Sequence, residues 1–410
     1  QNREEVFTKE QVKRYALAEK TFDKPVIIVT QAEAEIAEKG FSTKKKTWKF
    51  KAENVRDFGI STSRKFILDA MAVQLSEKTA MAVSLYPKEG NPLWEEYSTR
   101  AVAHTLKSYS SYTFDYPYSK AVSVSAQDQG MEYPMICWNY GRPEADGTYS
   151  DRIKWGMLGV IIHEVGHNFF PMIVNSDERQ WTWMDEGLNT FMEFLAESTF
   201  DPNFPLDRGP AKTIVPYMSG NQKFLEPIMS NSEGIIQFGN NAYGKPAAGL
   251  NIMREIIMGH ELFDYSFKVY ANRWKFKHPT PEDFFRTMED ASAVDLDWFV
   301  RGWFYTTDFT DIGIKEVKQF YVVNEKPTDA KKVVSNRRNR LNTSGAMVYL
   351  VPSKTESFSA DLEKPFDVKN FKTLDDFVAS NYSVEEKAVL KDPKYFYEVK
   401  FNKPGGLVMP

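Results

Sequence analysis

The pattern of hydrophobic and polar residues changes its period along the chain. Strand-like runs occupy residues 24–30, 46–53, 64–75 and 79–87. A helical period follows at 92–109, and an extended run comes next at 120–127. Most segments from Ser150 to Phe304 then have the spacing of helices. The first three quarters of the chain therefore predict a β-sheet combined with a helical part.

The last quarter of the chain returns to a strand-like pattern. After residues 308–317, short apolar runs alternate with polar stretches at 324–332 and 335–345. This change of period predicts a boundary near residue 310.

The helical region is interrupted by polar residues where a buried helix would stay apolar. The run from Trp155 to Ile162 is apolar, and His163, Glu164 and His167 follow it as an H-E-x-x-H sequence. In a helix the two histidines lie one turn apart on the same face, so their imidazoles can bind one metal ion. Such a sequence arises by chance in about one of every hundred chains of this length, so the surrounding sequence has to decide whether it is a metal site.

Composition limits the kind of metal site. The chain has 410 residues, 42% hydrophobic and 26% charged, as expected for a globular protein with a large core. Cys137 is its single cysteine, which excludes intrachain disulfides and sites built from several thiolates. Any metal must therefore be bound by nitrogen and oxygen atoms.

Charge and hydropathy narrow the range of partners. A formal net charge of −4 gives no reason to expect nucleic acid or an anionic membrane. The sequence has no apolar run near the roughly 20 residues that span a bilayer. It starts at Gln1, without a signal sequence, so we expect a processed chain or a piece of a longer one. An extracytoplasmic or periplasmic location is expected ahead of a cytoplasmic one.

Two imidazoles make an incomplete site, because a catalytic zinc usually has three protein ligands and an open fourth position. A second helix signal, at residues 183–199, has an apolar stripe and carries Glu186 near its start. Eighteen residues separate Glu186 from His167, enough to end one helix, turn and return. Glu186 is the candidate third ligand, although alone it would be explained as well by the helix dipole.

These segments resemble the gluzincin aminopeptidases, the family of membrane alanyl aminopeptidase and leukotriene hydrolase, in a bacterial-type form. That family combines H-E-x-x-H, an eighteen-residue interval and a glutamate. Its upstream G-x-M-E-N segment is matched here by Gly130, Met131 and Glu132, and its downstream Y-x-K-G segment by Tyr243 and Lys245. The resemblance extends from about residue 50 to residue 310.

Three positions depart from the family pattern. Tyr133 stands where the family usually has Asn, and Pro246 where it usually has Gly. Asp185 replaces the Asn that usually precedes the glutamate. None of these changes removes a side chain that takes part in the chemistry, so we expect the site to be retained.

The resemblance implies an α+β fold. We expect a thermolysin-like zinc metallopeptidase catalytic domain, made of a β-sheet and a helical part, at residues 53–310. Partial β-domains are expected to flank it, with the end of an N-terminal β-domain or a lead-in at 1–52 and the start of a C-terminal β-region at 311–410. Relatives have a complete β-domain before the catalytic domain, so the chain is expected to be a fragment.

The resemblance also implies the cofactor and the reaction. One Zn²⁺ ion would be bound by His163, His167 and Glu186, and would act as a Lewis acid. Glu164 would take a proton from the water that attacks the carbonyl carbon. The Tyr243 hydroxyl would donate a hydrogen bond to the oxyanion, whereas without the resemblance it would be read as a packed aromatic side chain.

Glu132 defines the expected substrates. A carboxylate beside the zinc can pair with the free α-ammonium of a peptide, with Gly130 and Met131 as further substrate-binding residues. We therefore expect a zinc aminopeptidase that removes N-terminal residues from peptides with a free N-terminus. Without the resemblance, Glu132 would be interpreted as a surface glutamate at a turn before Pro134.

Other functions remain open on the same fold. The chain could be a non-catalytic peptide-binding scaffold that has lost activity, or an endopeptidase or epoxide hydrolase. The remaining histidines, His104, His260 and His278, lack partner spacing and are expected to have structural roles. Cys137 is expected to be a small buried hydrophobic residue.

Overall fold

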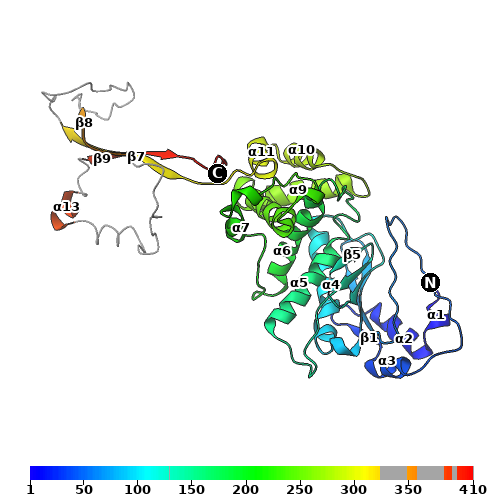
Figure 1. Cartoon of the computed structure of the whole chain (residues 1–410). Helices are drawn as coiled ribbons and strands as arrows, with labels where there is room; N and C mark the ends of the chain where they lie inside the picture. The colour runs from blue at the N-terminus through cyan, green and yellow to red at the C-terminus, as the bar shows by residue number, and fades with distance from the viewer. Residues whose placement is uncertain (129, 324–348, 358–382, 390–394, 410) are drawn as a thin grey trace. The chain divides into compact units, whose positions relative to one another are not determined.

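The computed structural model describes residues 1–128, 130–323, 349–357, 383–389 and 395–409 (Figure 1). The chain forms two compact units, Gln1–Thr307 and Asp308–Met409, which are described separately. Among the described residues, none of the helices combines the length and hydrophobicity that crossing a membrane requires. The predicted domain ranges 1–52, 53–310 and 311–410 stay predictions.

A six-stranded mixed sheet lies in the first unit, in the order β1-β2-β3-β4-β6-β5. Its strands are β1 (Val26–Val29), β2 (Ile67–Gln74), β3 (Thr79–Tyr86), β4 (Lys120–Ser125), β5 (Met131–Tyr133) and β6 (Ile136–Asn139). The pairs β3–β4 and β4–β6 are parallel, and the other neighbouring pairs are antiparallel. Because β5 is last in this order, it forms an edge of the sheet.

Most of the helical part follows the sheet in the sequence, whereas α4 (Leu93–Tyr112) lies between β3 and β4. The other main helices are α5 (Asp151–Gly166), α6 (Leu188–Phe200), α7 (Ala211–Met218), α8 (Lys245–Ile252), α9 (His260–Trp274), α10 (Pro281–Ser292) and α11 (Asp297–Tyr305). π-Helices lie at η2 (Trp183–Gly187), η5 (Gly239–Gly244) and η6 (Met253–Ile257), and short 3-10 helices at Lys88–Gly90, Gln222–Phe224 and Ser232–Gly234. A mixed sheet with this helical part confirms the predicted α+β class.

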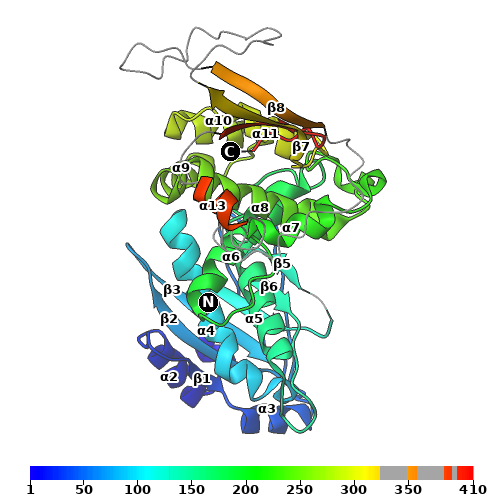
Figure 2. The same cartoon turned by 90° about the vertical axis from the view of Figure 1, so that its left-hand side faces the viewer.

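Helix α4 connects the sheet to the other helices. It contacts β2, β3 and β4 on one side, and α5, α6 and α9 elsewhere. Helices α9, α10 and α11 gather at one end of the first unit, away from the N-terminal helices (Figures 1 and 2). The H-E-x-x-H helix α5 therefore lies between the sheet and the helical end.

Aromatic side chains fill the space around η2. Trp183 is fully buried, and its ring centroid lies 4.9 Å from that of Phe304 and 5.6 Å from that of Phe285. Phe284 adds an edge contact with Trp183 and lies 4.8 Å from Tyr270. Helices α9, α10 and α11 thereby hold the start of η2, the element that carries Glu186.

The strand predicted at residues 46–53 is wrong, because this segment has no regular secondary structure. Its aromatic side chains, Trp48 and Phe50, stack on each other at 6.2 Å and remain about half exposed or more. Trp48 also packs edge-on against Phe7 at 5.4 Å. The alternation of apolar and polar residues here reflects local aromatic contacts rather than strand pairing.

The N-terminal part also contains helices that the hydrophobic pattern did not indicate: α1 (Arg3–Val6), α2 (Lys9–Ala18) and α3 (Gln31–Glu38). Thr8 and Thr30 start α2 and α3 with complete capping boxes, in which Gln11 and Glu33 return a hydrogen bond. The sequences T-x-x-Q and T-x-x-E carry that signal. Both helices were therefore predictable from their caps.

The second unit contains an antiparallel three-stranded sheet in the order β8-β7-β9. Its elements are β7 (Gly313–Val323), β8 (Tyr349–Ser357), α13 (Val384–Val389) and β9 (Tyr395–Asn402). A short parallel bridge joins Phe309 to Gly406 within this unit. The polar stretches at 324–332 and 335–345 lie outside the described residues.

A buried polar cluster links the sheet to helix α4. Asp69 of β2 is fully buried and accepts hydrogen bonds from the Tyr86 hydroxyl, at 2.6 Å, and from Thr99 of α4. Ser84 lies 2.6 Å from the Thr99 hydroxyl and 2.8 Å from that of Ser98. Burial raises the pKa of Asp69 to about 7.

We expect Asp69→Asn to flatten the pH dependence of stability. The Asp69 pKa is about 7 when folded and ordinarily 3.8, so the folded chain keeps a proton that the unfolded chain releases between these values. The free energy of unfolding should therefore fall as pH rises through this interval, by up to about 4 kcal/mol. Asparagine keeps a hydrogen-bond acceptor and does not titrate. In thermal denaturation, the Tm should fall less between pH 4 and pH 8 in the variant than in the parent. If the plots of Tm against pH run parallel for the two proteins, Asp69 does not have the raised pKa.

Helices α4, α5 and α6 approach one another closely at Gly166. A Cβ atom there would collide with the Tyr109 hydroxyl and with the side-chain oxygen of Asn189. The Tyr109 hydroxyl donates to that oxygen at 2.9 Å, and Asn189 Nδ2 donates to the His163 carbonyl at 2.8 Å. Gly166 is therefore required by close packing beside His163.

Gly166→Ala should destabilise the chain by about 1–3 kcal/mol, because the added methyl group forces its neighbours to move. Gly156→Ala in the same helix is the matched control, since a Cβ there meets nothing within 4 Å. This control gains only helix propensity, up to about 1 kcal/mol. In urea denaturation, the midpoint of Gly166→Ala should lie below that of the parent and the midpoint of Gly156→Ala above it. Equal midpoints for the two variants would show that Gly166 is not tightly packed.

Candidate active site

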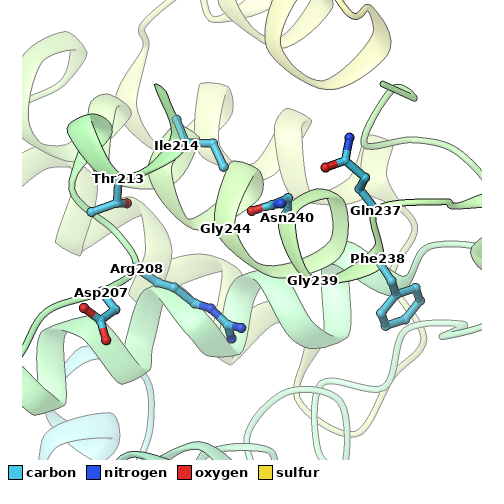
Figure 3. Close-up of a pocket in the computed structure, with 9 residues that line it drawn as sticks. All are labelled: Asp207, Arg208, Thr213, Ile214, Gln237, Phe238, Gly239, Asn240 and Gly244. Carbon is cyan, nitrogen blue, oxygen red and sulfur yellow. The ribbon is translucent and has the colours of Figure 1, made fainter. Parts of the chain in front are cut away.

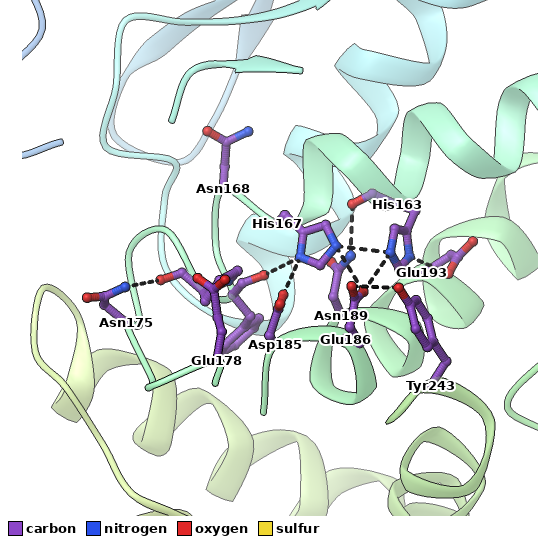
Figure 4. A network of polar contacts seen from close by, with 12 residues as sticks. His163, His167, Asn168, Asn175, Glu178, Asp185, Glu186, Asn189, Glu193 and Tyr243 are labelled. Carbon is purple, nitrogen blue, oxygen red and sulfur yellow. Dashed lines mark hydrogen bonds and ion pairs between the residues drawn. The ribbon is translucent and has the colours of Figure 1, made fainter. Parts of the chain in front are cut away.

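Helix α5 presents both histidines of the H-E-x-x-H sequence on one face (Figure 4). The helix begins after Ser150, whose hydroxyl accepts a hydrogen bond from the Ile153 amide. His163 lies in its last turn, and His167 follows its last residue with a backbone that is still helical. The two Nε2 atoms are 3.0 Å apart, and both side chains are buried.

Glu186 reaches the same point from η2, directly before α6. Its Oε2 lies 3.1 Å from Nε2 of His163 and 3.3 Å from Nε2 of His167. η2 is a π-helix, a rare element that often marks functional sites. The structure thus brings the three candidate ligands together, and their function as zinc ligands stays a prediction.

The three donor atoms form a triangle with edges of 3.0–3.3 Å. Ligands at about 2.0–2.1 Å in a tetrahedral zinc site are separated from one another by about 3.3 Å. Two imidazole nitrogens and one carboxylate oxygen also suit zinc, with one position left for a small molecule. The residues present therefore fit a catalytic zinc ion.

Carboxylates surround the two imidazoles. Burial opposes protonation of His163, but Glu193 and Glu186 outweigh it and raise the pKa to about 10. Asp185, Glu132 and Glu186 likewise raise the pKa of His167, against its burial. The centre holds more negative charge than its own side chains neutralise, which favours a bound cation.

Each histidine also has an acceptor behind it. Nδ1 of His163 lies 2.9 Å from Oε2 of Glu193, and Nδ1 of His167 lies 2.9 Å from the Phe170 carbonyl and from Asp185. A proton on Nδ1 that faces these acceptors leaves the Nε2 lone pair free for a metal. The sequence reasoning missed Glu193, although it follows Glu186 by seven residues, two helical turns.

Glu164 points into the same centre from the next position of α5. It is 6% exposed, and burial raises its pKa to about 7. Its Oε2 has no hydrogen-bond partner within the part of the chain that the structure describes. A Cβ at Gly130 would collide with Glu164 Oε1 and lie 2.7 Å from Val160, so glycine lets this segment pass beside the carboxylate.

Glu132 joins the centre from strand β5. Its carboxylate lies close to Glu164 and His167, with one ligand atom of each within 4.8 Å of the others. Met131 precedes it in the strand, and its side chain is 45% exposed. Neighbouring residues of a strand point to opposite faces, so Met131 does not share the direction of Glu132.

A further carboxylate, Glu178, lies beside Glu132. Oxygen atoms of Glu132, Glu178 and Asp185 are within 4.8 Å of one another. Glu178 forms an ion pair with Arg56 at 2.5 Å, which brings the coil before β2 to the edge of the centre. Neither Glu178 nor Arg56 was singled out in the sequence, because nothing in their spacing relates them to H-E-x-x-H.

Tyr243 approaches from η5. Its hydroxyl donates to Oε1 of Glu186 at 2.6 Å, and its ring lies 5.7 Å from that of His163 with 22° between the planes. Burial and Glu186 hold the pKa of Tyr243 well above its usual range, so the hydroxyl keeps its proton. The Arg208 guanidinium lies 4.8 Å from the ring centroid.

Two hollows lie around Tyr243. A cleft of about 1070 Å³ opens onto His163, Glu164 and Tyr243. A smaller pocket of about 390 Å³ lies between η5 and the segment before α7, where Asp207 and Arg208 line it (Figure 3). Both residues also border the large cleft, so they form part of the wall between the two hollows.

The departures from the family pattern have local explanations. Tyr133 packs edge-on against Trp138 of β6, with 5.4 Å between ring centroids. Pro246 would lie 2.5 Å from a Cβ at Gly187, so the glycine and the proline ring fit together where η2 meets α8. Asp185 faces His167 Nδ1, as described above.

Other residues considered in the sequence lie elsewhere. His104 contacts the Ala196 carbonyl, His278 the Asn175 carbonyl and His260 the carboxylate of Glu255. Cys137 is buried in β6, and burial raises its pKa above the usual range. None of these four side chains is among the metal-ligand groups of the described residues.

Known proteins resemble part of this chain. Aminopeptidase 2, mitochondrial, from Saccharomyces cerevisiae is 23% identical over 264 residues, covering 61% of this chain and 28% of the relative. Alanine/arginine aminopeptidase from the same organism is 23% identical over 279 residues, covering 62% and 31%. The chain thus spans less than a third of the length of these curated relatives.

Among solved structures, the M1 zinc metallopeptidase from Deinococcus radiodurans is similar, with 16% identity and a TM-score of 0.46. The match covers 59% of this chain and 52% of that one. The Peptidase family M1 domain model matches residues 97–303, which include H-E-x-x-H, Glu132, Glu186 and Tyr243. This match covers half of the chain, and the chain therefore belongs to peptidase family M1.

Proposed function

We propose that this chain carries the active site of a zinc-dependent aminopeptidase that removes N-terminal residues from peptides with a free N-terminus. One observation carries the proposal: Nε2 of His163, Nε2 of His167 and Oε2 of Glu186 converge within 3.3 Å, with Glu132 and Glu164 beside them. Membership in peptidase family M1 supports it. Residues 53–310 would form the catalytic domain of the protein.

His163, His167 and Glu186 would hold one Zn²⁺ ion, with Glu193 and Asp185 behind the imidazoles. When bound, the ion would polarise the scissile carbonyl and lower the pKa of a water molecule. The direction of the histidine pKa shifts supports this set, because a divalent cation would neutralise the surrounding carboxylates.

Glu164 would act as the general base. It is close enough to the ligands to take a proton from an attacking water, and burial places its pKa at about 7, near the optimum for proton transfer at neutral pH. Its unpartnered Oε2 gives such a water an acceptor. Glu164 would then return the proton to the leaving amine.

Tyr243 would donate its hydroxyl to the oxyanion that forms on the carbonyl oxygen. The hydroxyl already lies beside the centre, 2.6 Å from Glu186 Oε1, and its raised pKa keeps the proton available. The oxygen is therefore already in place, and the hydroxyl would turn its single proton from Glu186 Oε1 to the oxyanion.

Glu132 would bind the α-ammonium of the substrate and so fix the first peptide bond at the metal. Strand β5 is an edge of the sheet, so its main chain around Gly130 and Met131 is available to pair with an extended peptide. The first residue of the peptide would then lie beside β5, with its amine at Glu132.

Ligand substitutions should separate metal binding from proton transfer. His163→Ala, His167→Ala and Glu186→Ala should each lose zinc and activity, because three ligands are needed to hold the ion. Glu164→Gln should retain zinc and lose about 10²–10⁴-fold in kcat, because only the base is removed. Elemental analysis for zinc and turnover of an aminoacyl anilide measure the two effects.

Zinc content and turnover together can contradict the assignment of each ligand, of the base and of the enzymatic function separately. Full zinc occupancy in any of the three alanine variants would remove that residue from the ligand set. Loss of zinc from Glu164→Gln would show that Glu164 is a ligand rather than the base. A parent protein that binds one zinc but turns over no substrate would support a non-catalytic scaffold instead.

Glu132→Ala should raise KM and lower kcat together, with unchanged zinc content, because one ion pair both binds the amine and positions the carbonyl. Acetylation of the substrate amine should abolish turnover by the parent, since it removes the charge that Glu132 pairs with. Free and acetylated peptides are compared in a single preparation. Equal cleavage of both would favour an endopeptidase.

A further inference from the structure

One face of α5 continues from the candidate metal ligands along the cleft. The α5 residues that line the cleft are Arg152, Ile153, Trp155, Gly156, Gly159, Val160, His163 and Glu164. Apart from Trp155, they follow the i, i+3, i+4, i+7 spacing of a single helical face. The cleft is therefore a groove whose floor is α5 and whose inner end is the candidate active site.

Two glycines form the middle of this floor. A Cβ at Gly156 would meet nothing within 4 Å, and a Cβ at Gly159 would meet only the flexible ends of Glu197, at 3.3 Å, and Glu193. Glycine inside a helix costs about 1 kcal/mol relative to alanine. Packing does not require glycine at position 156. A side chain there would enter the groove, and glycine leaves that space open.

The groove also borders the segment that carries the residue proposed to bind the amine. Gly130, two residues before Glu132, lines the cleft together with His163, Glu164 and Tyr243. A peptide whose amine is held at Glu132 and whose first carbonyl is at the metal must place its remaining residues beyond the metal. The groove along α5 opens from that point.

The groove has the length and the lining for an extended peptide. Gly156 lies seven positions before His163 and Arg152 lies eleven positions before it, which corresponds to about 10 Å and 16 Å along a helix. An extended peptide covers these distances with about three to five residues. The apolar side chains of Phe194 and Phe204 also line the cleft.

We propose that this groove binds the three to five residues that follow the cleaved bond, and that Gly156 is a specificity-determining position for peptide length. The inference rests on the proposed function for the position of the reacting bond. The preferred substrates are then peptides of four or more residues rather than dipeptides.

Peptide length is the first test. Substrates are alanine peptides of two to six residues with a free amine and an amidated C-terminus, so that charge near Arg142 and Arg152 does not vary. For the parent, kcat/KM should rise at least about tenfold from the dipeptide to the tetrapeptide–hexapeptide range and then level off. Alanyl anilide serves as the reference substrate, because it occupies none of the outer groove.

Gly156→Leu should fill part of the groove, since a Cβ at this position meets nothing within 4 Å, and leucine favours a helix. The ratio of hexapeptide to anilide kcat/KM should fall at least about tenfold in this variant, while its Tm should not decrease. Gly156→Ala should change the ratio much less. Gly40→Leu is the matched control outside the groove, since a Cβ at Gly40 also meets nothing within 4 Å.

Binding gives a readout that does not depend on turnover. In the zinc-loaded Glu164→Gln background, calorimetry should show tighter binding of the hexapeptide than of the dipeptide, and Gly156→Leu should remove the difference. Anilide turnover without any effect of length in either assay would overturn the groove proposal and leave the proposed function standing. The parent could instead bind longer peptides more tightly, with Gly156→Leu removing this effect, and yet turn over no anilide. That result would support the groove and reject the proposed function.

Discussion

The close approach of α5 to α4 and α6 at Gly166 sets the geometry of the whole centre. Asn189 accepts a hydrogen bond from Tyr109 and donates one to the His163 carbonyl, so three helices are fixed beside the first candidate ligand. Because α6 continues directly from η2, the same contact fixes the distance from Glu186 to the imidazoles. The aromatic side chains around Trp183 hold η2 from the other side.

The electrostatics of the centre depend on that packing. Burial brings the carboxylates of Asp185, Glu186 and Glu193 to within 3.3 Å of imidazole nitrogens, where water cannot screen them. Carboxylates so crowded would repel one another without a cation. The packing therefore maintains a concentration of negative charge at this candidate metal site, which favours binding of a cation.

The sequence predicted the parts of the fold and site that depend on local spacing. Helix α4, strands β2 and β3 and the shared face of His163 and His167 follow from periodicity, which the structure confirms. Glu186 followed from the need for a third ligand and the interval after His167. The positions of Glu132 and Tyr243 came only from the family resemblance, because no local period relates a strand residue and a distant tyrosine to α5.

Other features depend on contacts that a single sequence does not reveal. Arg56 and Glu178 meet across 122 residues, and the packing of Gly166 involves three helices. Residues 46–53 alternate like a strand but find no partner, since pairing is decided by neighbours rather than by the run itself. The capping boxes at Thr8 and Thr30 were local signals that a search for hydrophobic periods overlooks.

Glu186 and Tyr243 both lie on π-helices that contact each other. A π-helix amounts to one residue inserted into an α-helix, and one residue corresponds to about 100° of rotation around the helix axis. Loss of a single residue from Trp183–Gly187 would let the segment relax to an ordinary α-helix and turn Glu186 away from the imidazoles. In this part of the chain, the number of residues is thus as strictly constrained as their identity. In a relative, deletion of one residue here would displace Glu186 from the imidazoles as effectively as substitution of Glu186 would remove its carboxylate.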